Sequence, residues 1–164
     1  MSFPGIPSLD AAVMAFIQTH FHNTVTDTVF PIITSLGEAG IGWIVLSLVL
    51  LCFKKTRRTG GLVLIAMTVT LLFGELTLKN IICRLRPCNV FTDFPMLIAR
   101  PTSYSFPSGH TSSSFAAALI LTLRHKKVGW LAYIPAVLIA FSRIFLFVHY
   151  PTDVLAGILL GTLA

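Results

Sequence analysis

Charged residues are scarce in this chain. Only 11% of its 164 residues are Asp, Glu, Lys or Arg, and only six of these are acidic. Hydrophobic residues make up 55% of the sequence, and the mean hydropathy is +0.85. Charged residues are about a quarter of an ordinary soluble domain, so this composition excludes that class and predicts an integral membrane protein.

Cysteine is also sparse, and the three thiols lack the paired spacing of a metal site. Cys52 lies in an apolar run and is expected to be a structural thiol. Cys83 and Cys88 flank a predicted extracytoplasmic turn, so the sequence leaves a disulfide between them open. The first residues have no basic start and carry Asp10 early, so no cleavable signal peptide is expected.

Basic residues are clustered rather than spread along a solvated face. Seven of the twelve Lys and Arg fall in two short stretches, residues 54–58 and 124–127, each between apolar runs. They are not interleaved with aromatic residues that could stack on bases, so nucleic-acid binding is not expected despite the net charge of +6. By the positive-inside tendency, both stretches are predicted to be cytoplasmic turns.

Long apolar runs predict an all-α fold, a polytopic transmembrane helical bundle with five clear spans. A span needs about 20 mostly apolar residues, at about 1.5 Å of rise per residue. The predicted spans are residues 40–53 with part of the preceding segment, 60–82, 109–123, 129–148 and 151–164.

The first 38 residues predict two short helices. An amphipathic helix in the membrane interface is expected over 8–22, with Asp10 and Gln18 off its apolar face. A second helix is expected over 23–36, interrupted at Pro31. Whether this pair forms a sixth span is left open. The apolar face of the first helix is predicted from Leu9, Val13, Phe16 and Ile17.

The spans bring the remaining polar residues to one face of the membrane. If both basic stretches are cytoplasmic, the second and fourth spans end outside, and the third and fifth begin outside. Glu75 and Lys79 form a pair within the second span, and such buried charges indicate function. The connection over 83–106 is long for a bundle, which favours a lid or a substrate-entry segment. The residues that meet outside are Lys79, Arg86, His110, Arg143, His149 and Asp153.

Three of these residues suit the binding of a phosphoryl group. Lys79, Arg86 and Arg143 form a cationic cage that can neutralise phosphoryl oxygens, and arginine offers forked donors. Ser108 is a candidate N-cap of the third span. Gly109 lets the backbone approach a ligand closely, and the positive end of the helix that follows favours an anion.

Two histidines supply the reacting groups. His149 precedes Asp153 by one helical turn, so the carboxylate can orient the imidazole, and His149 is the expected nucleophile. His110 lies on another helix and is the expected general acid for the leaving oxygen. No metal or other cofactor is expected, because the cage is cationic and no carboxylate cluster accompanies it.

Three motifs in this region resemble the signature motifs of the type 2 phosphatidic acid phosphatase superfamily. They are Lys79-Asn-Ile-Ile-Cys-Arg-Leu-Arg86-Pro87, Pro107-Ser108-Gly109-His110, and Ser142-Arg143-Ile-Phe-Leu-Phe-Val-His149-Tyr-Pro-Thr-Asp153. Every diagnostic position is present, in order, over 79–153. The resemblance implies a helical bundle and metal-independent dephosphorylation through a phosphohistidine. It assigns phosphate binding to Lys79, Arg86, Ser108, Gly109 and Arg143, the acid to His110, and the nucleophilic dyad to His149 with Asp153.

The resemblance also implies a substrate class. Bacterial membrane members of similar size dephosphorylate undecaprenyl diphosphate or phosphatidylglycerophosphate. The expected partner is therefore a phosphorylated lipid in the bilayer, with undecaprenyl diphosphate first and phosphatidylglycerophosphate, phosphatidic acid or lipid A as alternatives. Many undecaprenyl diphosphate phosphatases of the superfamily have Asp where this chain has Gly109, which leaves the exact lipid open.

We expect a single integral-membrane phosphatase domain over 1–164, with short helices in 1–38 and the catalytic bundle in 39–164. It is expected in the cell membrane with its active site on the extracytoplasmic side.

Vanadium haloperoxidases share this set of site residues, but they are soluble, and the five apolar spans argue against a soluble protein. A non-catalytic transporter would use the charges as packing pairs or an ion path, but it would not need two histidines and three cations on one face. The oligomeric state is not determined by the sequence.

The positive-inside argument gives a test of orientation. Single cysteine reporters near Asp93 should react with a membrane-impermeant thiol reagent added outside intact cells, whereas reporters near Arg57 and Lys126 should not. The opposite labelling pattern would place the histidines on the cytoplasmic side.

Overall fold

The computed structural model describes residues 3–164, and these residues form helices and connecting segments without a β-strand. The predicted all-α fold is confirmed. The elements are α1 Ser8–His20, α2 Thr24–Leu36, η1 Glu38–Gly40, α3 Ile41–Leu51, α4 Arg57–Thr70, η2 Leu71–Leu78, α5 Lys79–Ile82, α6 Pro87–Val90, α7 Gly109–Arg124, η3 Gly129–Ala132, α8 Tyr133–Phe145 and α9 Pro151–Leu163.

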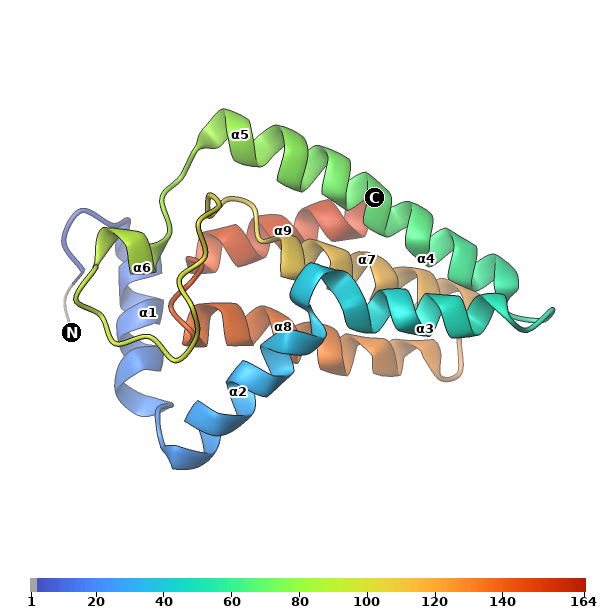
Figure 1. Ribbon diagram of the computed structural model, residues 1–164, viewed down its shortest axis with the longest axis horizontal. Coiled ribbons are helices and arrows are strands. Elements are labelled where there is room, and N and C mark those ends of the chain that lie inside the picture. The colour runs from blue at the N-terminus through green and yellow to red at the C-terminus, as the bar shows by residue number, and fades with distance from the viewer. Residues whose placement is uncertain (1–2) are drawn as a thin grey trace.

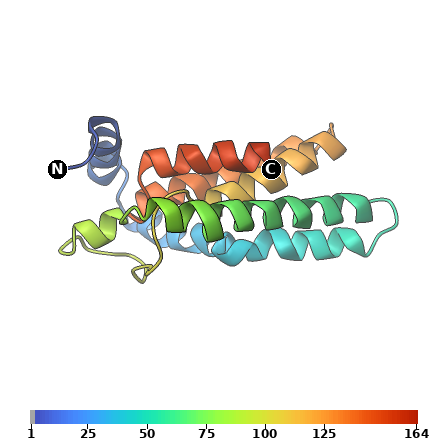
Figure 2. The same ribbon diagram turned by 90° about the horizontal axis from the view of Figure 1, so that it is seen from above.

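Helix α7 is the centre of the bundle. It packs against α4, α8 and α9, and α3 packs against α4. These helices run along the long axis of the molecule, whereas α1 crosses one end of it (Figures 1 and 2). Small side chains allow this crowding, because Ala116, Ala117 and Ala118 of α7 are all buried.

Glycines on α9 bring its backbone close to α7. A Cβ atom on Gly161 would lie 2.3 Å from the carbonyl oxygen of Ser112, and one on Gly157 would lie 2.7 Å from that of Ser108. Both separations are far below van der Waals contact, so glycine is required at both positions. This packing holds the start of α7 against α9, and Asp153 lies in the first turn of α9.

The outside of the bundle is apolar. Large hydrophobic side chains are more than half exposed along the helices, among them Leu48, Ile65, Phe73, Leu76, Val137 and Leu159. Such a surface suits a lipid environment rather than water. The helix Arg57–Val90 is long and apolar enough to cross a membrane, and the pair Thr24–Leu36 and Glu38–Leu51, bent by 45°, meets the same criterion together. The count of five spans stays a prediction, because the C-terminal apolar helices are shorter than a full span.

The two basic stretches lie at the same end of the bundle. Residues 54–58 follow α3 and residues 124–127 follow α7. Thr59 Oγ1, at the start of α4, lies 3.1 Å from Nε2 of His125. This end is opposite to the end that carries α1 and α6 (Figure 1).

Helix α1 turns polar side chains toward the protein. Asp10 and Gln18 are buried, whereas Leu9 is 58% exposed and Phe16 is 56% exposed. The predicted apolar face is wrong in part, because Ile17 is buried on the side that carries Asp10 and Gln18. The sequence did not reveal that distant segments supply hydrogen-bond partners for these polar groups. A location in the membrane interface stays a prediction.

Helix α2 is continuous through Pro31, so the predicted interruption is wrong. The Asn23 side chain accepts hydrogen bonds from the N–H groups of Val25 and Thr26, and α2 packs along α8. Capping and packing offset the hydrogen bond that proline removes. The chain then bends between α2 and α3, where Ala39 and Gly40 have φ of 47° and 70°.

The close approach of α9 to α7 predicts a stability difference between two glycines. Gly161→Ala should lower the thermal midpoint in detergent by an amount equivalent to about 1–3 kcal/mol, because the methyl group would press on a backbone oxygen. Gly61→Ala is the matched control, since a Cβ there has nothing within 4 Å and alanine favours a helix. A Gly161→Ala protein as stable as the Gly61→Ala protein would contradict this packing.

Candidate active site

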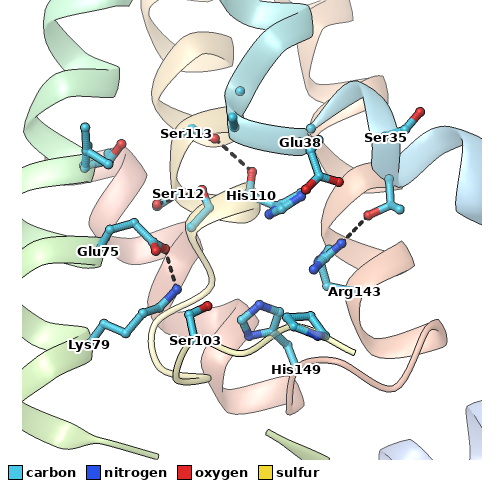
Figure 3. Close-up of a pocket in the computed structure, with 18 of the residues that line it drawn as sticks. Ser35, Glu38, Glu75, Lys79, Ser103, His110, Ser112, Ser113, Arg143 and His149 are labelled. Carbon is cyan, nitrogen blue, oxygen red and sulfur yellow. Dashed lines mark hydrogen bonds and ion pairs between the residues drawn. The ribbon is translucent and has the colours of Figure 1, made fainter. Parts of the chain in front are cut away.

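A cavity of about 1100 Å³ lies between the α2–α3 bend, α4 with η2, and the start of α7. Six of the predicted site residues line it: Lys79, Arg86, Gly109, His110, Arg143 and His149. Figure 3 shows the side chains of Lys79, His110, Arg143 and His149 around one open space, although they come from different elements. Ser108 and Asp153 lie behind this lining and are fully buried.

Lys79 enters the cavity from a helix with an irregular middle. The segment η2 is π-helical, which widens the turn that contains Glu75 just before Lys79. The Lys79 Nζ atom lies 2.6 Å from Oε1 of Glu75, and both side chains face the cavity (Figure 3). The buried ammonium group is therefore paired with a carboxylate, as a charge at this depth requires.

The Arg86 guanidinium contacts the predicted nucleophile directly. Its Nη1 atom lies 2.9 Å from His149 Nε2 and also donates to the carbonyl of Val148 at 2.9 Å. Arginine has no acceptor, so His149 Nε2 must be the accepting, unprotonated nitrogen. The proton of the neutral ring is then on Nδ1. Nε2, the nitrogen on the cavity side, carries the lone pair that a nucleophile needs.

Asp153 faces the other nitrogen of His149. Its Oδ2 atom lies 3.6 Å from Nδ1, and Ser105 lies beside both, with Oγ 3.4 Å from Nδ1 and a hydrogen bond to the same carboxylate oxygen. The N–H of Tyr150 donates to Oδ2 at 2.9 Å, and Arg84 Nη1 donates to Oδ1 at 2.7 Å. The carboxylate is thus fixed by three groups besides the imidazole.

A strained turn presents His149. Helix α8 ends at Phe145, and Phe147 has a φ of 60°, which is rare for a large side chain. Its fully buried ring stacks on Phe94 with 3.9 Å between ring centroids and also contacts Phe3 and Phe91. These aromatic contacts offset a backbone strain of roughly 1–3 kcal/mol. The turn returns to α8 through hydrogen bonds from the N–H groups of Val148 and His149 to the Arg143 carbonyl.

His110 and Arg143 complete the cavity wall. His110 lies in the first turn of α7, and its buried Nε2 atom has no hydrogen-bond partner within residues 3–164. Arg143 donates from Nη1 to the Thr34 hydroxyl, while its buried Nε has no partner in the same range. Buried polar atoms of this kind normally have hydrogen-bond partners, so both side chains are suited to contact an additional ligand.

Ser108 is at the N-cap position of α7, but its hydroxyl does not cap the helix. The hydroxyl accepts a hydrogen bond from Thr111 Oγ1 at 2.9 Å, and the Ser108 N–H donates to the carbonyl of Asp153 at 3.1 Å. The predicted N-cap position of Ser108 is confirmed, although its side chain makes no capping hydrogen bond. Because the side chain is engaged elsewhere, the N–H groups in the first turn of α7 remain suited to an anion.

Several residues around the site were not predicted from the sequence. Ser103 accepts from Arg86 through its carbonyl at 2.7 Å and its hydroxyl at 3.0 Å. The 83–106 connection therefore supplies polar groups to the site, a role beyond the predicted lid or entry segment. Arg84 lies inside the first motif, which was the only signal for it. The N-terminal helices also contribute, because Thr34 and Glu38 line the cavity.

The sequence predicted a structural thiol at Cys52 and left a disulfide between Cys83 and Cys88 open. Cys52, Cys83 and Cys88 are all free thiols, so the disulfide left open by the sequence is not formed. Cys83 is exposed and Cys88 is buried.

The described residues form an all-helical bundle with an apolar exterior around a buried group of cations and histidines, which suits a membrane protein that binds an anion. The chain belongs to the PAP2 superfamily, which it matches over residues 59–164. It is 40% identical over 121 residues to the undecaprenyl-diphosphatase of Sulfolobus acidocaldarius, a match that covers 73% of this chain and 58% of that protein. The chain therefore spans little more than half the length of this relative.

Two solved structures share the fold. A transmembrane PAP2-type phosphatidylglycerolphosphate phosphatase from Bacillus subtilis has a TM-score of 0.76 and 30% sequence identity, over 98% of this chain and 83% of that one. Aquifex aeolicus LpxE has a TM-score of 0.81 and 25% identity, over 99% and 95%. The chain is thus a helical membrane protein of a superfamily that includes phosphatases.

The Glu75–Lys79 pair predicts how the cavity responds to an anion. Glu75→Gln should tighten orthophosphate binding about tenfold, because one negative charge is removed beside the anion. Calorimetric titration in detergent compares the affinities of Glu75→Gln and wild type.

The matched control is Asp27→Asn. Asp27 is paired with His22 at 2.7 Å on α2 and does not line the cavity, so its removal should leave orthophosphate affinity unchanged. Weaker orthophosphate binding by Glu75→Gln would mean that Glu75 instead holds Lys79 in its binding position.

Proposed function

We propose that this protein is a metal-independent lipid phosphatase that acts through a phosphohistidine intermediate. The observation that carries the proposal is the arrangement of His149. Its Nε2 atom accepts from Arg86 at 2.9 Å on the cavity side, while Nδ1 faces Asp153 and Ser105. A nucleophilic imidazole needs this tautomer, with a cationic group beside the attacking nitrogen and an anionic group behind the ring.

The first half of the reaction transfers the phosphoryl group to the enzyme. The side chains of Lys79, Arg86 and Arg143 bind the phosphoryl oxygens. Arg86 shifts its hydrogen bond from His149 Nε2 to an oxygen of the substrate. His149 Nε2 then forms a bond to phosphorus as the bond from phosphorus to the leaving oxygen breaks, which in a lipid diphosphate is the oxygen that bridges the two phosphorus atoms. His110, protonated at this stage, donates a proton to the departing oxygen.

The second half regenerates the enzyme. His110, now neutral, removes a proton from a water molecule, and the resulting hydroxide attacks phosphorus while the bond to His149 breaks. Orthophosphate leaves, and His110 is protonated again. Asp153 stabilises the positive charge that the His149 ring carries while it is phosphorylated.

We favour a polyprenyl diphosphate, best undecaprenyl diphosphate, as the substrate. The relative from Sulfolobus acidocaldarius carries that activity in its name at 40% identity. The cavity wall also has an apolar part, formed by Ile44, Leu64, Met67 and Leu71, beside the cationic part. Phosphatidylglycerophosphate is the alternative, because the Bacillus subtilis protein with 30% identity is named for that substrate.

The experiment that tests the function is phosphate release in detergent. The panel contains undecaprenyl diphosphate, phosphatidylglycerophosphate, phosphatidic acid and lipid A, compared by kcat/KM with and without EDTA. We expect release that survives EDTA, since cationic side chains rather than a metal neutralise the phosphoryl oxygens. Loss of activity on chelation, with recovery by Mg²⁺, would contradict the metal-independent mechanism. The absence of phosphate release from every lipid would contradict the phosphatase function.

Replacing His149 and replacing His110 should impair different steps of the reaction. His149→Ala should form no acid-labile phosphoenzyme, because the attacking nitrogen is gone. His110→Ala should lose about 10²–10⁴-fold in kcat toward a lipid phosphate but less toward an activated aryl phosphate, whose leaving group needs little protonation. Rapid quenching with ³²P-labelled substrate measures the intermediate. Phosphate trapped on residue 110, or equal losses for good and poor leaving groups, would show that the roles are reversed.

A further inference from the structure

Asp10 is a buried carboxylate far from the site in sequence. It lies on α1 and is fully buried, although it does not line the cavity. Its Oδ1 atom accepts from the Thr152 N–H at 2.9 Å, and its Oδ2 atom accepts from the Thr152 hydroxyl at 2.8 Å and from Arg84 Nη2 at 2.7 Å. Every one of these partners lies within one residue of the dyad or contacts it directly.

Arg84 joins Asp10 to the dyad. Its Nη2 atom contacts Asp10 at 2.7 Å and its Nη1 atom contacts Asp153 at 2.7 Å, so one guanidinium spans two buried carboxylates. Its Cζ atom also lies 3.8 Å from the ring centre of Tyr150. The planar fork of arginine is held at both ends and on one face, which fixes the Asp153 carboxylate in turn.

The charges in this chain of contacts explain why two carboxylates are present. With Asp153 alone, the Arg84 cation would neutralise the carboxylate that must stabilise a positive His149 ring. With Asp10 on its other side, Arg84 shares its charge, and the three side chains together keep one net negative charge behind the imidazole. That charge opposes the positive charge which develops on His149 during phosphorylation.

Helix α1 is held in place by polar contacts, which agrees with this role. Gln18 Nε2 donates to the Phe145 carbonyl at 3.0 Å, at the end of α8 just before the turn that carries His149. Together with Asp10, it docks α1 across the end of α8 and the start of α9 (Figure 1). The buried face of α1 also includes Met14 and Ile17, so polar and apolar contacts together dock the helix.

We propose that Asp10 is a positioning residue for the His149–Asp153 dyad, acting through Arg84, so that α1 is part of the catalytic apparatus. The proposal rests on the phosphatase function proposed above. It assigns α1 a role in the phosphorylation step rather than in phosphate binding, because Asp10 lies behind the dyad and outside the phosphate cage.

The first test separates catalysis from binding in Asp10→Asn. Asparagine has nearly the same shape but lacks the charge, so kcat should fall about tenfold to a hundredfold while KM changes by less than about twofold. Asp27→Asn is the matched control, because Asp27 is also an acidic residue of the N-terminal helices, but within residues 3–164 its carboxylate pairs only with His22. It should keep wild-type kcat. The thermal midpoint of each protein is measured in the same detergent.

The second test asks whether Asp10 acts through Arg84. Arg84→Lys offers a single ammonium group that cannot span both carboxylates, so it should lower kcat by itself. Asp10→Asn should then cost little more in the Arg84→Lys protein, because the connection is already broken. Additive losses would show that Asp10 affects the enzyme by another route and would overturn the proposal, as would an unchanged kcat in Asp10→Asn with a lowered thermal midpoint.

A third readout does not depend on turnover. Orthovanadate completes its coordination with a nitrogen ligand, so it reports the orientation of His149, whereas orthophosphate reports only the cage. Calorimetry on Asp10→Asn should show about tenfold weaker binding of orthovanadate and unchanged binding of orthophosphate. If wild type hydrolyses no lipid but this difference is found, the phosphatase function fails and the positioning role stands. Equal orthovanadate affinities in Asp10→Asn and wild type would overturn the positioning role.

Discussion

The cost of burying positive charge in an apolar bundle governs this structure. Lys79, Arg86 and Arg143 are nearly inaccessible to solvent, and each contacts a different set of partners. Lys79 has a carboxylate, Arg86 has carbonyls, a hydroxyl and an imidazole, and Arg143 has a hydroxyl. Three cations that lie close together and are not fully neutralised attract an anion strongly, which is the property a phosphoryl site needs.

Irregular backbone is concentrated around the cavity. The π-helical segment before Lys79, the bend at Ala39 and Gly40, and the turn at Phe147 all border it or place a side chain in it. In a membrane such departures from helix are tolerated only where protein or a cavity surrounds them. The aromatic packing on Phe147 shows how one of these departures is stabilised. Regular helices thus form the bundle, and a few irregular segments position side chains in the cavity.

In the proposed function, the phosphoryl group and the rest of the lipid contact different parts of the cavity. The cationic wall would bind the phosphoryl group, which every lipid phosphate shares, and the names of two similar proteins point to different lipids. The apolar wall from α3, α4 and η2 and the N-terminal residues Thr34 and Glu38 are where substrates differing in chain or headgroup would be distinguished. Glu75, whose carboxylate occupies the space beside Gly109, adds a negative charge next to the cationic wall.

The sequence by itself determined the helical class, most helix boundaries and the set of residues that gather at the cavity. It could do so because apolar runs, basic turns and three local motifs are short-range patterns, and threading them through a bilayer leaves one arrangement of the ends. Only the tertiary structure decided the tautomer of His149, the Ser103 and Ser105 contacts, and the link from Asp10 through Arg84 to Asp153. Those depend on side chains up to 142 residues apart in the chain, and in sequence a buried Asp10 looks the same as an exposed one. Burial is a property of what packs against a residue, so no pattern on α1 alone could reveal it.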